Sequence, residues 1–137
     1  MSVPPAAFLA AVRAHIGVRY RLHGADRQGV DCLGLVVSAL HEAGGARLRP
    51  AHYRLRQTDI APFIAWARDV GFDECDSGPG AQQDGDILLV VTGPAQHHCI
   101  VRDGDEIIHA HAGLRRVVRQ PRPSDWTRTA AFRLKGV

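Results

Sequence analysis

Residues 30–40, Val-Asp-Cys-Leu-Gly-Leu-Val-Val-Ser-Ala-Leu, decide the fold of this chain, because they predict a helix that must be buried. Their apolar side chains recur every three or four residues, and a second apolar stripe runs beside the first. Asp31 is placed to cap the first turn, and Gly44-Gly45 predicts the end of the helix. Cys32 therefore falls in the first turn, where backbone N–H groups and the helix dipole favour a thiolate.

The size and charge of the chain predict a single globular domain over residues 1–137. A chain of 137 residues can bury one hydrophobic core without disulfides or metals. Its 17 Lys and Arg against 14 Asp and Glu give a formal net charge of +3, which permits attraction to a polyanion. Because no basic run is interleaved with aromatic residues, we expect no nucleic-acid binding.

The cysteine content and the N-terminus bear on the compartment. Three cysteines without a C-x-x-C pair predict no disulfide framework and favour a reducing compartment. Residues 1–14 lack the basic and apolar regions of a signal peptide, and no run of 18 apolar residues occurs. We therefore expect a protein made in the cytoplasm, with no signal peptide and no membrane span.

The order of the predicted elements favours an α+β fold, with helices first and an antiparallel sheet after them. A first helix is expected from Pro4-Pro5 to Ile16, ended by Gly17, and a third helix from a Thr58 cap to Gly71. Loops are predicted over residues 17–31, 45–56 and 73–83. Strands are predicted over residues 87–91, 98–102, 105–111, 117–118 and 130–134, with Trp126 packed between the last two.

One predicted hairpin gathers most of the remaining chemistry, namely His97, His98, Cys99, His109 and His111. A nucleophilic cysteine needs a base, and the base needs an orienting partner. A two-residue loop at Asp103-Gly104 would place His98 opposite His109, whereas a three-residue loop at 102–104 would place His97 there. The pattern leaves this choice open, because a slip of one residue exchanges the two histidines.

Four motifs now carry a family resemblance: Gly17-Val18-Arg19-Tyr20, Asp31-Cys32-Leu33-Gly34-Leu35, Asp84-Gly85-Asp86-Ile87-Leu88 and Ile108-His109-Ala110. Together with the histidine pair, they resemble the NlpC-type papain-like cysteine peptidases of bacterial cell walls. The subgroup found in phage tails and gene-transfer agents is the most similar. The resemblance implies a papain-like fold, with N-terminal helices packed on a small antiparallel sheet.

The resemblance also implies an activity and its partners. We expect a cysteine endopeptidase that hydrolyses amide bonds in peptidoglycan stem peptides and needs no cofactor or metal. Its partners would be the peptidoglycan peptide and other phage-tail proteins, and it could be carried in a tail or a gene-transfer particle. A γ-D-glutamyl linkage to a diamino acid is the bond that the resemblance suggests.

Residue roles follow from the same resemblance. Cys32 would be the nucleophile, Tyr20 an oxyanion donor and His109 the residue that orients the base. The family spacing of twelve residues before His109 favours His97 as the base, with His98 as the alternative. Two departures bear on substrate preference: Leu33 follows the cysteine where the family usually has serine, and His23-Gly24 stands where a Gly-Gly pair often follows the tyrosine.

Two other classes of function remain as alternatives. One is a catalytically inactive tail protein that keeps the same fold. The other is a metal site built from His97 or His98, Cys99, His109 and His111, since these ligands suit Zn²⁺. Adjacent residues on a strand point to opposite faces, which opposes joint ligation by His98 and Cys99. Cys75 and Cys99 are expected to be structural.

Overall fold

The computed structural model describes residues 3–48, 60–75, 81–94 and 96–135. In chain order, these residues form α1 (Pro5–Ala14), β1 (Ala25–Asp26), β2 (Gly29–Val30), α2 (Cys32–Glu42), α3 (Ala61–Asp69), β3 (Phe72–Cys75), β4 (Ile87–Gly93), β5 (Gln96–Asp103), β6 (Glu106–His111), β7 (Arg116–Pro121) and β8 (Thr127–Leu134). The predicted α+β class is confirmed. None of the helices described is long and apolar enough to cross a membrane.

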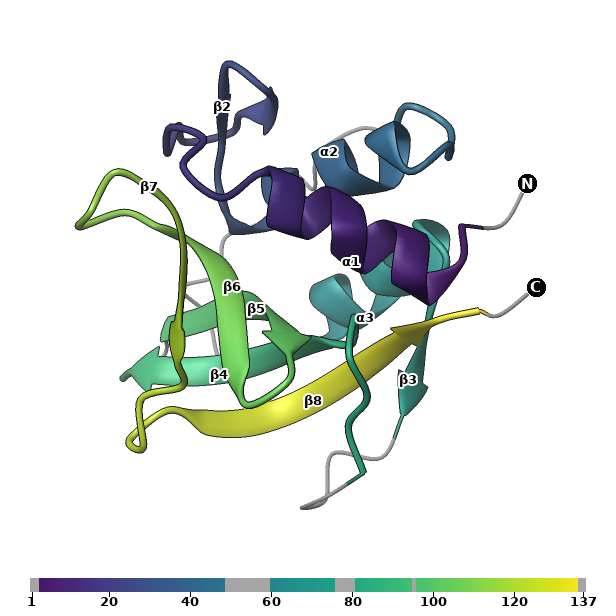
Figure 1. Ribbon diagram of the computed structural model, residues 1–137. Helices are drawn as coiled ribbons and strands as arrows, with labels where there is room; N and C mark the ends of the chain where they lie inside the picture. The colour runs from purple at the N-terminus through teal and green to yellow at the C-terminus, as the bar shows by residue number, and fades with distance from the viewer. Residues whose placement is uncertain (1–2, 49–59, 76–80, 95, 136–137) are drawn as a thin grey trace.

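The main sheet has six strands in the order β3-β8-β4-β5-β6-β7, and all of their pairings are antiparallel. Figure 1 shows α1 and α2 stacked over one side of this sheet, with the first and last described residues near each other. The end of α1 is tied to α2, because His15 Nε2 lies 2.7 Å from Ser38 Oγ. Arg13 of α1 also donates to Asp103 at the end of β5, at 3.0 and 2.6 Å.

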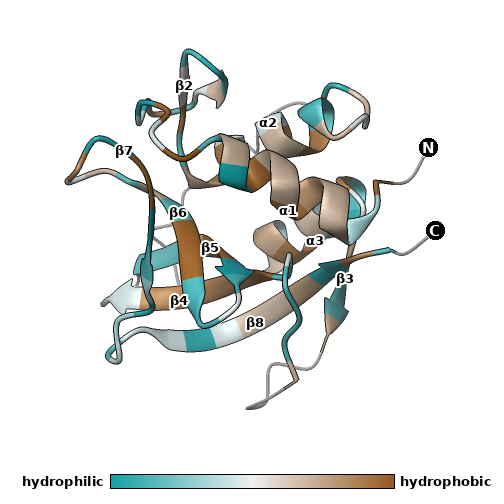
Figure 2. Ribbon diagram, viewed as in Figure 1, coloured by the Kyte–Doolittle hydropathy of each residue, from teal (hydrophilic) through white to brown (hydrophobic). Residues whose placement is uncertain are grey.

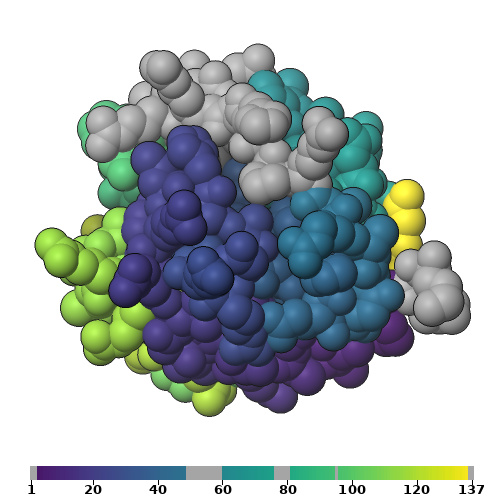
Figure 3. Space-filling model, turned by 90° about the horizontal axis from the view of Figure 1, so that it is seen from above, coloured from purple at the N-terminus to yellow at the C-terminus, as the bar shows by residue number. Residues whose placement is uncertain are grey.

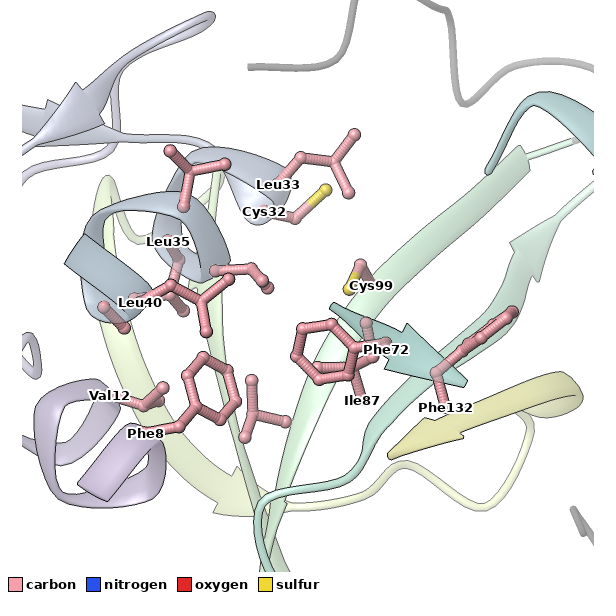
Figure 4. Close-up of a cluster of buried hydrophobic side chains, with 14 of the residues drawn as sticks. Phe8, Val12, Cys32, Leu33, Leu35, Leu40, Phe72, Ile87, Cys99 and Phe132 are labelled. Atoms are coloured by element: carbon pink, nitrogen blue, oxygen red, sulfur yellow. The ribbon is translucent and has the colours of Figure 1, made fainter. Parts of the chain in front are cut away.

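Buried side chains lie on both faces of the sheet. The larger cluster joins α1, α2 and α3 to one face, and Figure 4 shows Phe8, Leu40, Ile87 and Phe132 as members of it. The smaller cluster covers the other face and contains Leu88, Val90, Ile100, Ile107 and Ala131, with Trp126 against it. Burial on both faces explains why β4 is a continuous apolar run rather than an alternating one, as the brown ribbon in Figure 2 shows.

The central helix forms as its sequence predicts. The Asp31 side chain accepts a hydrogen bond from Gly34 N at 2.7 Å, which satisfies one N–H of the first turn. The same carboxylate accepts from His23 N at 2.9 Å and so holds the preceding loop. All residues from Cys32 to Leu40 are buried, so α2 is apolar around its circumference. The helix ends at Glu42, just before Gly44-Gly45.

The segment before α2 is more ordered than the predicted loop. It contains the short β1–β2 hairpin, in which Ala25 pairs with Val30. Tyr20 N donates to Arg115 O at 2.9 Å, and Arg27 donates to Glu42 of α2 through two bonds of 2.7 Å. In the view from above, this segment fills the space between the β6–β7 turn and the second half of α2 (Figure 3). The loop is thereby fixed beside the start of α2.

Two other sequence predictions need correction. The third helix begins at Ala61 with Ile60 as its N-cap residue, and the predicted Thr58 cap lies outside the described residues, as does most of the predicted loop over 45–56. Residues 72–75 form strand β3, where a loop starting at Asp73 was predicted, because the strand pairs with β8 and buries Phe72. Phe72 is the only fully buried side chain of this strand, and one buried residue is too few to form the alternating pattern that predicts a strand.

The hairpin register differs from both predicted alternatives. Asp103 pairs with Glu106, so the two-residue loop is Gly104-Asp105. Gly104 has φ +63°, whereas Asp105 is not among the residues with positive φ, the signs of a type II′ turn. The pairing of β5 with β6 ends at Val101 and Ile108, before it reaches His109. Neither His97 nor His98 lies directly across from His109.

The contact between Gly24 and Gly34 predicts a stability effect. A Cβ on Gly34 would overlap the backbone carbonyl of Gly24, which cannot move without displacing the loop. We expect Gly34→Ala to lower the free energy of unfolding by about 3 kcal/mol, measured by urea denaturation. Gly93→Ala is the control, since its Cβ would meet only the end of the Gln96 side chain at 3.4 Å. Equal stability of the two variants would contradict the close contact.

Candidate active site

A cavity of about 750 Å³ opens where the start of α2 meets the ends of β5 and β6. Its lining includes every residue that the sequence singled out for catalysis, namely Tyr20, Cys32, His97, His98 and His109. Asp31, His111 and Trp126 also line it. The fold thus brings together residues from the first loop, the central helix and the hairpin.

Cys32 is the first residue of α2 and only 7% exposed. Figure 4 shows it on the side of α2 that faces β5, close to Cys99. Burial raises the pKa of the Cys32 thiol to about 12 and the nearby Asp31 carboxylate adds to this, while backbone N–H groups of Cys99 and Leu33 oppose it. Burial therefore opposes the thiolate that the helix position favours.

Tyr20 lies beside the thiol. It forms an isolated parallel bridge with Val30, two residues before Cys32, and its side chain packs against the main core. Burial raises the pKa of the Tyr20 hydroxyl, and the neighbouring Cys32 and Asp31 contribute to the same shift. A protonated hydroxyl at this place can donate a hydrogen bond into the cavity.

The second half of the site is a chain of hydrogen bonds that runs across three strands. His98 Nε2 of β5 lies 2.7 Å from His109 Nδ1 of β6, and His109 Nε2 lies 3.0 Å from Gln120 Oε1 of β7. His98 lies on the same face of β5 as Ile100, beyond the last residue of β5 that pairs with β6. Trp126 packs edge-to-face against both imidazoles, with centroid distances of 5.7 and 5.5 Å.

Burial suppresses protonation of these two imidazoles. It lowers the pKa of His98 to about 3, and the neighbouring His109 and His111 add to the effect. The pKa of His109 is also lowered by burial, although the bond to Gln120 acts in the opposite direction. Both rings are therefore neutral at pH 7, so each carries one proton and one free nitrogen.

His97 occupies the other face of β5. It pairs with Val91, and Cys99 pairs with Leu89, so His97 shares the face that α2 covers. The two adjacent histidines therefore differ in their contacts. His97 lies on the same side of the sheet as Cys32, whereas His98 forms the hydrogen bond with His109. Among the described residues, no hydrogen bond joins Cys32 Sγ to either imidazole, although all of them line the cavity.

The other residues that the sequence analysis discussed lie apart from this chain of hydrogen bonds. Cys75 is at the end of β3, with its Sγ 4.0 Å from the Asp86 carboxylate, outside the cavity. Cys99 is buried beneath Cys32. In the part of the chain that the structure describes, no three His, Cys, Asp or Glu side chains are grouped to hold a metal ion.

The sequence analysis missed Gln120 and did not connect Trp126 to the histidines. Trp126 was expected near the last strands, but only the fold shows that it covers the imidazole pair. Gln120 is a polar residue on an edge strand, and no local signal distinguishes it from its neighbours. Its position opposite Ile107 could have been inferred only from the pairing of β6 with β7.

Several solved structures share this fold. The NlpC/p60 domain of the peptidoglycan hydrolase SagA is 21% identical with a TM-score of 0.66, covering 96% of this chain and 100% of that domain. An N-acetylmuramoyl-L-alanine amidase from Bacteroides uniformis is 15% identical with a TM-score of 0.66, covering 96% of this chain and 98% of the amidase. An NlpC/P60 family protein from Bacillus cereus is 16% identical with a TM-score of 0.67. That match covers 98% of this chain, but this chain spans only 41% of the B. cereus protein.

No curated protein matches the sequence significantly. The model of the NlpC/P60 family, however, matches residues 17–133, from the loop that carries Tyr20 to the last strand. This match includes every residue of the cavity described above. The chain therefore belongs to the NlpC/P60 family.

Proposed function

We propose that this protein is a cysteine endopeptidase that hydrolyses an amide bond in peptidoglycan stem peptides. The observation that carries the proposal is the shared cavity, which joins a cysteine at a helix start to Tyr20 and a pair of bonded imidazoles. Family membership supports the same reaction class. The names of two similar structures, a peptidoglycan hydrolase and an N-acetylmuramoyl-L-alanine amidase, support the substrate class.

In this mechanism, Cys32 Sγ attacks the carbonyl carbon and an imidazole takes the thiol proton. The tetrahedral intermediate then collapses: its C–N bond breaks, the amine leaves with the proton that the imidazole took, and a thioester acyl-enzyme remains. Water hydrolyses this acyl-enzyme, which releases the acid and restores the thiol. The oxyanion is held by the Cys32 N–H, in the first helical turn, and by the Tyr20 hydroxyl. Because burial raises the pKa of the thiol, proton transfer accompanies the attack rather than preceding it in this mechanism.

Within this proposal, the base is His97, and His109 is the residue that orients the base. The face that His97 shares with Cys99 supports this assignment, as does the spacing of twelve residues before His109. The hydrogen bond between His98 and His109 supports His98 as the alternative. Substitution of each histidine separates the two assignments.

The proposal also covers which bond is cleaved and which particle carries the protein to the cell wall. The sequence resemblance favours a γ-D-glutamyl linkage to a diamino acid, whereas the name of the Bacteroides structure denotes an amidase. The resemblance to the phage-tail and gene-transfer subgroup favours a protein carried to the wall in such a particle. A basic balance of charges suits an anionic cell wall.

Digestion of purified peptidoglycan tests the proposed function. We expect the wild type to release fragments cut within the stem peptide and Cys32→Ala to lower the rate by a factor on the order of 10⁴ or more. Mass spectrometry of the fragments identifies the bond. Equal fragment patterns from both proteins would end the cysteine mechanism, and cleavage between muramic acid and L-alanine would make the protein an amidase.

The two histidine variants identify the base. We expect His97→Ala to lower kcat/KM by about 10³, because proton removal from the neutral thiol is lost. His98→Ala should cost about tenfold or less, since His97 would remain on the face of the sheet that α2 covers. The measurement is the initial rate on soluble stem-peptide fragments, with folding checked by circular dichroism. The reverse ranking would assign the base to His98.

The protonation state of Cys32 has its own test. Because burial raises the pKa of the thiol to about 12, its alkylation by iodoacetamide in the absence of substrate should be slow at pH 7. We expect the rate to rise by about tenfold for each pH unit from 7 to 10, as the thiolate fraction rises. Mass spectrometry of the labelled peptide measures it, with Cys32→Ser as the background. A plateau below pH 8 would instead show a preformed thiolate.

A further inference from the structure

We propose that Gln120 is a positioning residue that fixes the tautomer of His109 and, through it, leaves one nitrogen of the catalytic imidazole free to accept a proton. The inference rests on the proposed cysteine mechanism with His98, the alternative base, as the catalytic imidazole, because His109 is bonded to His98 and His97 lies on the other face of β5. Gln120 lies on β7 and lines no part of the cavity. It therefore acts only through His109.

The orientation of the Gln120 amide follows from its two neighbours. Its Nε2 lies 3.5 Å from the carbonyl oxygen of Pro121, which can only accept a hydrogen bond. The NH₂ group is therefore turned toward Pro121, and Oε1 is turned toward His109 Nε2 at 3.0 Å. Because Oε1 can only accept, the proton of His109 must be on Nε2.

The position of this proton determines which atoms donate and which accept in the rest of the hydrogen-bond chain. With Nε2 protonated, neutral His109 has a free Nδ1, which accepts a hydrogen bond and cannot donate one. In the structure the donor is His98 Nε2, at 2.7 Å. A histidine held in this way carries its proton on Nε2 and keeps Nδ1 free. That free nitrogen is what a base needs in order to take the proton of Cys32.

In the part of the chain that the structure describes, no carboxylate is hydrogen-bonded to His98 or His109. The groups around the imidazoles are His111 of β6, whose ring centroid lies 5.4 Å from that of His109, and the indole of Trp126. Arg102 of β5 and Arg128 of β8 share the same face of the sheet. Gln120 therefore selects a tautomer and, as a neutral acceptor, favours the imidazolium less than a carboxylate in its place would do.

Two variants whose side chains are similar in size to glutamine distinguish a positioning role of Gln120 from a merely structural one. Gln120→Leu removes the acceptor, so both His109 tautomers become accessible, and we expect kcat/KM on soluble stem-peptide fragments to fall about tenfold. Gln120→Glu keeps the acceptor and should keep the plateau rate. Its negative charge favours the imidazolium, so the base stays protonated to higher pH, and the acid limb of the pH profile should move up by about one unit.

Nitrogen NMR of the imidazoles gives a readout that does not depend on activity. In the wild type we expect His109 to show a protonated Nε2 and an unprotonated Nδ1, and in Gln120→Leu a mixture of the two tautomers. A Leu variant with wild-type tautomer and wild-type pH profile would overturn the inference. If Cys32→Ala were fully active while the tautomers behaved as expected, the proposed mechanism would fail and the role of Gln120 toward His109 would stand.

Discussion

The Asp31 carboxylate is the contact on which the rest of the site depends. One of its oxygens accepts the N–H of Gly34 in α2, and the other accepts the N–H of His23 in the preceding loop. The helix start and the loop are thereby locked at one distance, so close that a Cβ on Gly34 would overlap the carbonyl of Gly24. Since Cys32 begins the helix and Tyr20 begins the loop, a single side chain sets the position of nucleophile and hydroxyl together. The cost is a negative charge beside the thiol, which helps to keep it protonated.

The elements that the sequence predicts well are those whose signals are local. α2 has a capping side chain at its start, glycines after its end and a continuous apolar surface between them, and each signal involves only neighbours in sequence. The run of β4 is equally clear, because it is buried on both faces. Cys32 and the histidine cluster stand out by residue type and position, whereas the roles of Tyr20, His97 and His109 follow from the family resemblance.

The features that could not be predicted from the sequence depend on contacts between segments that are far apart in the chain. The hairpin turn lies one residue later than predicted, because Asp103 is not a loop residue. Its carboxylate is buried at the end of β5, where Arg13 of the first helix and Arg119 of β7 hold it. The histidine that reaches His109 is His98, and this contact too depends on how β5 and β6 lie against each other. The pKa of the thiol and the role of Gln120 also depend on packing and strand order, which no short pattern encodes.

The order of strands in the sheet has a consequence for how the protein is made. β8, the last strand in the chain, lies between β3 and β4, where Phe72 pairs with Leu134 and Ile87 pairs with Phe132. Until residues 127–134 have left the ribosome, β3 has no partner and the outer edge of β4 is open. Pairings between such distant segments slow folding, because the intervening chain must first be closed into a loop. The helices can form early, but Trp126 reaches the histidine pair only when this strand is in place, so the site is assembled last.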